Sequence, residues 1–356
     1  MDGVTDAVCR YISKTYGNPD VVYTEYVSAE GLWRIKKRGE MDHKIWNELK
    51  YDESERPVVA QLFGSDPDSF YEAAKIVVDL GFDGIDINMG CPSPGLEKRE
   101  GGAGLMRSRE RAREVIEATR RGVEDWAKRS GAEMLNGVRS PRLTDGRAHN
   151  DGVGLGTMRE REIPVSVKTR VGSTKPDEEW WNFLAEMRLP AVAMHGRTFR
   201  QLYSGKADWG VLKEAGQIIR ASGALFLGNG DVLEIKGRDR NDKGEWSVVL
   251  NNGEGRSLDG FDGVLVGRAA IGNPWVLRKD GVEPSREERL RLVLEHALAH
   301  EKLFPGYFMP ARKHFAAYVK GMADAKELRK WLVRAEKAED VRVVIETAIA
   351  KETDKI

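Results

Sequence analysis

Residues 84–94 read GIDINMGCPSP, a short and mostly apolar run that ends in a glycine, a cysteine and two prolines. The isoleucines and the turn residues that follow them predict a strand over Gly84–Met89. Six other runs in the chain have the same character, and most are continuously apolar rather than alternating. This pattern is typical of parallel strands that are covered on both faces.

The seven runs alternate with helical patterns, as in Asp68–Leu80 and from Ser108 to about Trp126. This order predicts an α/β fold. No GxGxxG motif follows an early strand, which argues against a dinucleotide-binding sheet. We therefore expect a (β/α)8 TIM barrel. The other six predicted strands are Val21–Val27, Pro57–Phe63, Ile163–Thr169, Ala191–Gly196, Ala224–Gly228 and Gly263–Gly267.

The predicted barrel domain covers residues 1–282 and departs from the regular pattern at three places. Residues 1–6 resemble a loop that should follow a strand, so the barrel apparently lacks its first strand in this chain. Residues about 130–162 and 235–259 read as insertions. The second contains Trp246–Leu250 followed by Asn251–Gly253, which predicts a hairpin. Either insertion could contact RNA or could be surface decoration.

Residues 283–356 predict a second domain, a helical bundle. Ser285 and Glu288 form a capping box that begins the first helix, which Pro305 and Gly306 end. A second helix is predicted over Pro310–Lys320, and one or two more from Asp324 onward. The expected apolar positions are Leu290, Val293, Leu294 and Leu298, and then Leu328, Trp331 and Leu332.

Composition excludes several classes of protein. The 356 residues, 40% of them hydrophobic, suit one barrel of ~250 residues with an appendage. The sequence has no apolar run long enough for a membrane span and no signal-peptide pattern. The two cysteines provide no disulfide framework and fit a reducing compartment. We expect a cytoplasmic, monomeric protein without a membrane segment.

Charge is balanced overall, with 57 basic and 57 acidic residues, but it is uneven along the chain. Between Lys302 and Arg334 there are eight basic and two acidic residues, a local excess of six positive charges. This excess fits either a solvated helix face or a nucleic-acid-binding surface.

Functional groups of such barrels lie where the strands end. Lys168 ends an otherwise apolar strand, and a buried ammonium needs an anionic or polar partner. Gln61 and Asn88 could instead cap turns, and His195 could be structural. The loops at Gly228–Asp231 and at Gly267-Arg268 could hold a phosphate. Together these residues suit flavin mononucleotide (FMN), whose ring needs hydrogen bonds and a nearby positive charge.

Cys91 lies in a strand-end loop and indicates the reaction class. It has no CxxC partner and no metal-ligand spacing, so we predict no metal site. Cys9 is expected to be a small buried hydrophobe, and Cys91 could be one too. An ordinary thiol has a pKa of about 8.5, so at neutral pH it is protonated and can donate a proton.

The chain resembles the tRNA-dihydrouridine synthases, closest to their bacterial B-type branch. The motifs that support this resemblance run through the predicted barrel and the tail. They are residues 1–6 (MDGVTD), 88–94 (NMGCPSP), 101–106 (GGAGLM), 167–170 (VKTR), 195–198 (HGRT) with Gln201, Tyr203 and Gly205, 228–231 (GNGD), 266–275 (VGRAAIGNPW), and 311–314 (ARKH) with Tyr318, Lys320 and Gly321.

The resemblance implies reduction of the C5=C6 bond of a uridine in tRNA, with hydride from reduced FMN to C6 and a proton from Cys91 to C5. NADPH would re-reduce the flavin. In the family, the loop at residues 1–6 follows a strand that ends in Ala-Pro, which this sequence lacks. The implied FMN ligands are Met1, Asp2, Gln61, Lys168, His195, Asn229, Gly230, Asp231, Gly267 and Arg268. The implied substrate ligands are Asn88, Arg170 and Tyr203 for the uracil, and Arg312, Lys313 and Lys320 for tRNA phosphates.

Two alternatives remain open. The chain could be an FMN barrel that reduces a free small molecule, such as a dihydroorotate or enoate reductase, although the basic motif at 312–321 argues against this. It could also be a non-catalytic tRNA-binding protein. A flavin absorption band near ~450 nm in the purified protein would argue against this second alternative, since that band is a property of the flavin itself.

Overall fold

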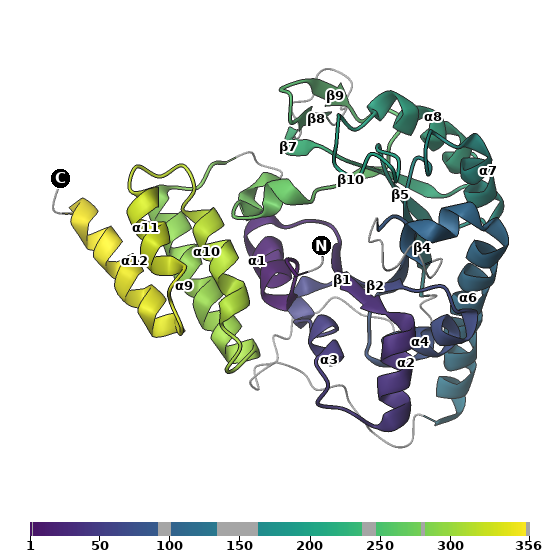
Figure 1. Cartoon of the computed structure of the whole chain (residues 1–356), viewed down its shortest axis with the longest axis horizontal. Helices are drawn as coiled ribbons and strands as arrows, with labels where there is room; N and C mark the ends of the chain where they lie inside the picture. Colours follow the sequence, from purple (N-terminus) through teal and green to yellow (C-terminus); the bar gives the residue numbers. More distant parts are fainter. Residues whose placement is uncertain (2, 92–100, 134–162, 237–246, 279–281, 354–356) are drawn as a thin grey trace. The chain divides into compact units, whose positions relative to one another are not determined.

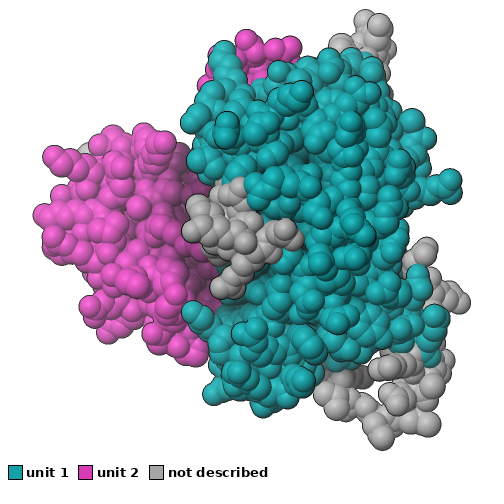
Figure 2. Space-filling model, turned by 45° about the vertical axis from the view of Figure 1, so that its right-hand side comes forward, with its two compact units in different colours: residues 1–2, 21–231, 258–265 teal, residues 3–20, 232–257, 266–356 magenta. Residues whose placement is uncertain are grey.

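The structure, a computed structural model, describes residues 1, 3–91, 101–133, 163–236, 247–278 and 282–353 (Figure 1). The chain forms two compact units (Figure 2). The sheet unit comprises Met1–Asp2, Val21–Asp231 and Leu258–Leu265. The helical unit comprises Gly3–Asp20, Val232–Ser257 and Val266–Ile356. The predicted boundary near residue 283 stays a prediction, because these units divide the chain differently.

The sheet unit contains one parallel sheet whose order is β1-β2-β3-β4-β5-β6-β10. All seven predicted strands are confirmed, and with them the α/β barrel-type fold. Within the described part of the chain, β1 and β10 are the end strands of this order. The bounds are β1 Val22–Ser28, β2 Val58–Phe63, β3 Gly84–Asn88, β4 Val165–Arg170, β5 Ala191–His195, β6 Leu225–Asn229 and β10 Gly263–Leu265.

Helices follow the first five strands and cover the outer side of the sheet (Figure 1). Ser28, Asp66, Asp177 and Asp208 each accept a hydrogen bond from a backbone N–H in the first turn, which explains where four of these helices begin. The segments are α2 Ala29–Arg38, α3 Ile45–Glu48, η1 Glu53–Glu55, α4 Pro67–Asp79, η2 Gly102–Arg107, α6 Arg109–Glu133, α7 Glu178–Glu186 and α8 Trp209–Arg220.

The core of the sheet unit explains why the strands are apolar along most of their length. All five residues of β3 are buried, because helices cover one face of the sheet and strand side chains fill the other. The buried side chains include Val27, Ala60, Leu62, Ile85, Ile87, Val167, Val192, Met194 and Phe226.

Both insertions differ in part from the prediction. α6 continues to Glu133, seven residues beyond the predicted end near Trp126, because backbone hydrogen bonds continue after the apolar pattern has stopped. Residues 134–162 lie outside the described part. The second insertion contains the predicted hairpin, with Gly253 in its turn at φ 81°. The sequence analysis missed β7, which begins just before the insertion and pairs antiparallel with β8. The strands are β7 Val232–Lys236, β8 Ser247–Leu250 and β9 Gly255–Ser257.

The helical unit confirms a helical bundle in the tail and the capping box of Ser285 and Glu288. Its core also includes Ala7, Val8 and Ile12 of the N-terminal helix, packed with Trp275. The elements are α1 Ala7–Gly17, η4 Arg268–Ala270, η5 Pro274–Leu277, α9 Arg286–Leu303, η6 Met309–Ala311, α10 Arg312–Tyr318, α11 Ala325–Leu332 and α12 Ala338–Thr353.

Two predicted core positions of this unit are wrong. Leu298 is 42% exposed and Trp331 is 49% exposed. Trp331 donates from Nε1 to Glu327, and the Lys330 ammonium lies 5.2 Å from its ring centroid. Leu328 and Leu332 are four residues apart and therefore fill one helix face, which leaves Trp331 on the solvent side.

No helix in the described part of the chain is long and apolar enough to cross a membrane.

Three histidines are buried in the core of the helical unit, His296 and His300 on α9 and His314 on α10. The ring centroids of His296 and His314 lie 4.9 Å apart, and His296 Nδ1 lies 2.9 Å from the Tyr318 hydroxyl. Burial lowers the pKa of all three, and that of His314 falls to about 4, although Asp6 opposes the shift for His300 and His314. The fold therefore holds neutral imidazoles.

Acid should destabilise this unit. Because the His314 pKa falls from 6.5 to about 4 on folding, its contribution is complete above pH 6.5 and is lost as the pH drops toward 4. We expect His314→Phe to remove a pH-dependent part of about 3 kcal/mol over that window. Urea unfolding at successive pH values measures it. His43→Gln, outside the cluster, should keep the wild-type slope, and an unchanged slope in His314→Phe would contradict the assignment.

Candidate functional site

Strand register brings the predicted site residues to one end of the sheet. Gln61 pairs with Asp86, and Asn88 pairs with Lys168 on the next strand. His195 lies between Arg170 and Asn229 in the same way. Because all the strands are parallel, these residues line the carboxyl edge of the sheet, as a barrel active site requires.

A buried hydrogen-bond network joins β2, β3 and β4 at this edge. Gln61 Nε2 donates to Asp86 Oδ2 at 2.7 Å, and Ser166 Oγ donates to Asp86 Oδ1 at 2.7 Å. Asn88 Nδ2 donates to Gln61 Oε1 at 3.0 Å. Both oxygens of the Asp86 carboxylate thus accept a hydrogen bond, and the Gln61 amide is held in one orientation.

The charges at this edge are shifted by burial. Burial raises the pKa of Asp86 to about 6, against the hydrogen bonds from Ser166 and Gln61 and the charge of Lys168. Burial, with the charge of Arg170, lowers the pKa of Lys168 to about 8, and Asp86 and Cys91 oppose that shift. The charge of Asp86 favours the protonated form of Lys168, which remains mainly protonated at neutral pH.

Cys91 lies in the loop after β3, and its backbone is fixed from two sides. Asn88 Oδ1 accepts hydrogen bonds from Gly90 N at 3.1 Å and from Cys91 N at 2.9 Å. Ala103 N donates to the Cys91 carbonyl at 3.2 Å. Asn88 therefore caps the turn, the alternative considered for it. The Cys91 thiol is half-buried and free, whereas Cys9 is buried, as expected.

Arg170 joins the cysteine loop to a second loop. Its guanidinium donates to the carbonyls of Gly90 at 2.9 Å, Thr198 at 3.0 Å and Leu202 at 2.9 Å. The side chain is 4% exposed, and burial lowers its pKa. A cation satisfied by three carbonyls positions these loops, which the sequence analysis did not foresee. Its predicted contact with the uracil remains a prediction.

The loop after β5 presents Tyr203 to solvent. Tyr203 is 62% exposed, with its ring centroid 6.0 Å from the Arg170 guanidinium carbon. Within the loop, Gln201 Oε1 accepts from Thr198 N at 2.7 Å. The loop is therefore internally braced, and it holds an aromatic ring where a planar ligand can stack.

Arg197 and Asp231 form a buried ion pair behind this loop. Arg197 NH2 lies 2.7 Å from Asp231 Oδ2, and the two side chains are 3% and 8% exposed. Asp231 Oδ2 also accepts from Ala207 N at 2.8 Å. The Asp231 side chain, a predicted FMN ligand, is thus engaged within the protein, and its direct contact with FMN stays a prediction.

His195 and Gly230 approach each other closely. Gly230 has φ 123°, and a Cβ there would lie 2.6 Å from Ala207 Cβ and 3.4 Å from His195 Nε2, so only glycine fits. His195 Nδ1 accepts from Arg197 N at 3.2 Å. The neutral imidazole therefore has its hydrogen on Nε2, facing the glycine.

Three contributors to this edge were absent from the predicted site, namely Asp86, Arg197 and Tyr26. Asp86 and Arg197 stand within the strand-end motifs, two residues before Asn88 and two after His195, and their charge in apolar surroundings could have identified them. Tyr26 on β1 has its hydroxyl 3.7 Å from Cys91 Sγ. No sequence spacing indicates that contact, because β1 and the loop are far apart in the chain.

The remaining predicted FMN ligands are placed as follows. Met1 is 38% exposed, and Asp2 lies outside the described part. Gly267 and Arg268 belong to the helical unit, where Gly267 precedes the short helix η4. Asn229 Nδ2 donates to Leu265 O at 2.9 Å, which joins β6 to β10. Their roles toward FMN remain predictions.

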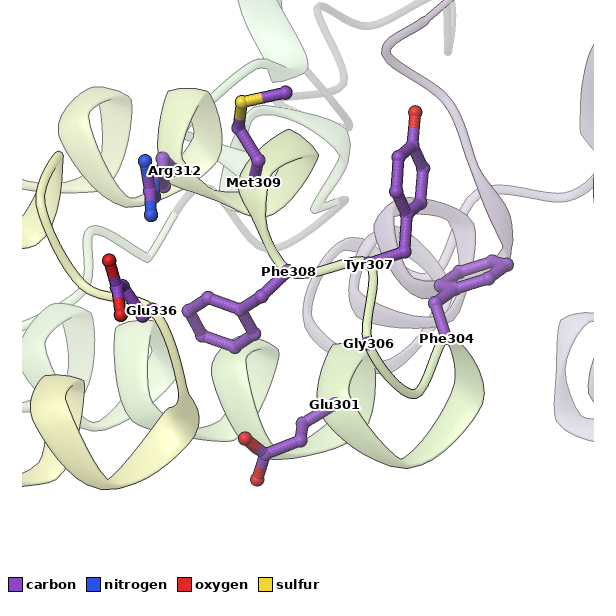
Figure 3. Close-up of a pocket in the computed structure, with 8 residues that line it drawn as sticks. All are labelled: Glu301, Phe304, Gly306, Tyr307, Phe308, Met309, Arg312 and Glu336. Atoms are coloured by element: carbon purple, nitrogen blue, oxygen red, sulfur yellow. The ribbon is translucent and has the colours of Figure 1, made fainter.

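The predicted tRNA-contacting residues lie on the surface of the helical unit. Lys313 and Lys320 are exposed, and Arg312 is half-buried with Nε donating to Ala335 O at 2.7 Å. Arg312 lines an open cavity of about 370 Å³ together with Tyr307, Met309 and Glu336 (Figure 3). Tyr307 is 59% exposed and Met309 is 65% exposed. The cavity lining thus combines the Arg312 cation with two carboxylates, Glu301 and Glu336, and with apolar groups.

Among the residues that the structure describes, no group of three or more histidine, cysteine, aspartate or glutamate side chains is placed to hold a metal ion.

Comparison with known proteins identifies the family. The sequence model of the family described as "Dihydrouridine synthase (Dus)" matches residues 1–128 and 156–354. This chain belongs to the dihydrouridine synthase family. The match includes both the strand-end edge with Cys91 and the helical unit. The B-type branch stays a prediction.

Individual relatives agree with the family match. A "Probable tRNA-dihydrouridine synthase" of Staphylococcus epidermidis strain RP62A is 29% identical, over 99% of this chain and 92% of that protein. A protein of the same printed name from Staphylococcus aureus strain COL is 28% identical, over 97% and 90%. A "Probable tRNA-dihydrouridine synthase 2" of Bacillus subtilis strain 168 is 27% identical, over 100% and 94%.

Removing the Arg170 guanidinium should loosen both loops. Arg170→Met leaves three carbonyls without their donor, so we expect a loss of about 2–4 kcal/mol in the free energy of unfolding and faster amide exchange at Gly90 and Cys91. Urea unfolding and hydrogen exchange measure these effects. Arg220→Met, which removes an exposed ion pair with Asp262, should cost less than about 1 kcal/mol. Equal losses in the two variants would refute the positioning role.

Proposed function

We propose that this chain reduces the C5=C6 bond of a uridine in tRNA, with bound FMN as cofactor and Cys91 as the proton donor. The printed names of its relatives support tRNA as the substrate. The observation on which the mechanism rests is Cys91, whose thiol is half-buried and whose backbone N–H is held by Asn88, the strand partner of Lys168.

The residues at the strand ends fit FMN. Lys168 supplies a cation at the sheet edge, and the Gln61 amide is pre-oriented. When bound, FMN supplies hydride chemistry, which the protein orients and tunes. We propose NADPH as its reductant. The proposed ligands are Met1, Asp2, Gln61, Lys168, His195, Asn229, Gly230 and Asp231, with Gly267 and Arg268.

The protein's own contribution to the reaction is to place a proton. Cys91 holds it on Sγ, and the hydrogen bonds to Asn88 and from Ala103 keep the thiol at the sheet edge. One hydrogen of Asn88 Nδ2 is donated to Gln61. We propose that Asn88 donates the other to a carbonyl oxygen of the uracil. Tyr203 would stack on the base, and Arg170 would contact it from the end of β4.

The helical unit would bind the tRNA backbone through Arg312, Lys313 and Lys320. A target base in folded RNA must leave its stack, at a cost of a few kcal/mol. Phosphate contacts would offset that cost and orient the RNA without reading its sequence. The exposed cations on α10 and α11 fit this role. Cytoplasmic location and a monomeric state stay predictions from the sequence.

The variant Cys91→Ala tests the reaction directly. It should keep its flavin absorption band and reduction by NADPH, because the thiol is not proposed to hold FMN. Dihydrouridine formation on unmodified tRNA should fall by about 10²–10⁴-fold, the usual contribution of a positioned acid. Nucleoside analysis of the digested tRNA gives the yield, and normal yield would refute the acid role.

The same assay separates the alternatives. Wild-type turnover on free uridine equal to that on tRNA would favour a reductase of small molecules. A purified protein that binds tRNA but no flavin would favour a non-catalytic binder. Cys9→Ala, at a buried cysteine of the helical unit, is the matched control for the loss of a thiol.

Binding of tRNA should depend steeply on salt. The double variant Lys313→Gln/Lys320→Gln should reduce the slope of log K against log salt by about 1.5, because each released phosphate contact contributes about 0.7–0.9. Filter binding between low and moderate salt measures the slope. Lys36→Gln, an exposed lysine on α2 of the sheet unit, should leave it unchanged. A flat wild-type response would contradict tRNA binding by this surface.

A further inference from the structure

The Tyr26 hydroxyl lies beside the proposed acid. Tyr26 is on β1, in register with Gln61 on β2, and its hydroxyl oxygen is 3.7 Å from Cys91 Sγ. Both side chains are half-buried, so the contact lies at the accessible edge of the sheet rather than deep in the core. A sulfur–oxygen hydrogen bond is longer than one between nitrogen and oxygen, and at this distance the thiol can donate to the hydroxyl.

The surroundings hold the Tyr26 ring in place. Phe63, the last residue of β2, packs edge-on against it, with ring centroids 5.1 Å apart and an interplanar angle of 86°. From the other side, Asn88, Ala103 and Arg170 fix the cysteine loop. The contact between Tyr26 and Cys91 therefore joins two independently fixed groups.

We infer that Tyr26 is a catalytic residue that hydrogen-bonds the Cys91 thiolate and returns a proton to it after each turnover. The inference rests on the proposed function. When Sγ–H breaks and its proton forms the new C5–H bond of the uracil, Cys91 is left as a thiolate that can only accept. The tyrosine O–H must then reverse the bond and donate to sulfur.

Recovery of the thiol follows with all atoms balanced. The Tyr26 proton moves to Sγ and restores S–H, and the phenolate oxygen takes up one proton from the bulk solvent, the proton that the overall reduction consumes. No oxidant or reductant takes part in this step. Lys168, whose pKa burial lowers to about 8, is the rival proton source. Tyr26 is favoured over Lys168 because its hydroxyl is in hydrogen-bonding contact with the Cys91 sulfur.

Tyr26→Phe is the informative variant, because it removes the hydroxyl and keeps the ring against Phe63. Iodoacetamide alkylation of Cys91 across pH is measured without tRNA or turnover. In the variant, we expect the pH of half-maximal alkylation to rise by about one unit, because the thiolate loses a donor. Dihydrouridine formation should slow by about tenfold or more, with the KM for tRNA and the rate of flavin reduction unchanged.

Two controls make the result decisive. Tyr71→Phe removes a hydroxyl that donates to Asp125 on α6, away from the site, and should match wild type in both assays. Cys91→Ala shows which labelling belongs to Cys91. A Tyr26→Phe alkylation profile identical to that of wild type would overturn the inference. A variant whose rate of dihydrouridine formation returns to the wild-type value at high tRNA concentration would also overturn it, because only its binding of tRNA would then be changed. Alkylation of Cys91 is measured without turnover, so it tests the contact with Tyr26 even if the proposed function is wrong. Failure of the proposed function would be seen separately, because wild type would then form no dihydrouridine.

Discussion

The hydrogen bonds from the Gly90 and Cys91 amides to Asn88 are the constraint on which the site depends. Asn88 is the last residue of β3, and its backbone pairs with Lys168 of β4. Its side chain accepts from the loop through Oδ1 and donates to Gln61 through Nδ2. A single amide thus transmits the rigidity of the sheet to the thiol, and Asp86 anchors the far end of the chain of hydrogen bonds.

The charges around this anchor are consistent with its burial. Asp86 and Lys168 are both shifted toward neutrality by desolvation, yet each opposes the shift of the other, so the pair holds one positive and one negative charge near neutral pH. Arg170 is also buried, and three carbonyls rather than a carboxylate satisfy it.

The sequence predicted which side chains lie together where position along a strand decides proximity, and the roles of these residues stay predictions. Gln61, Asn88, Lys168 and His195 each stand in the carboxyl-terminal half of a parallel strand, and parallel strands bring these halves to the same edge. It missed Tyr26 and the clamp of Arg170, because both act on partners in other segments. It misplaced Trp331 because Leu328 and Leu332, four residues apart, already fill the buried face of that helix.

The sequence by itself determined the seven parallel strands, their flanking helices, the capping box of the tail and the membership in a family, because each depends on local patterns of apolar, turn and motif residues. Only the tertiary structure decided which polar groups meet: that Asn88 caps the cysteine turn, that Asp231 pairs with Arg197, and that the N-terminal helix packs in the helical unit. These contacts join residues from separate segments, and the geometry of a hydrogen bond depends on distances that spacing along a chain does not specify.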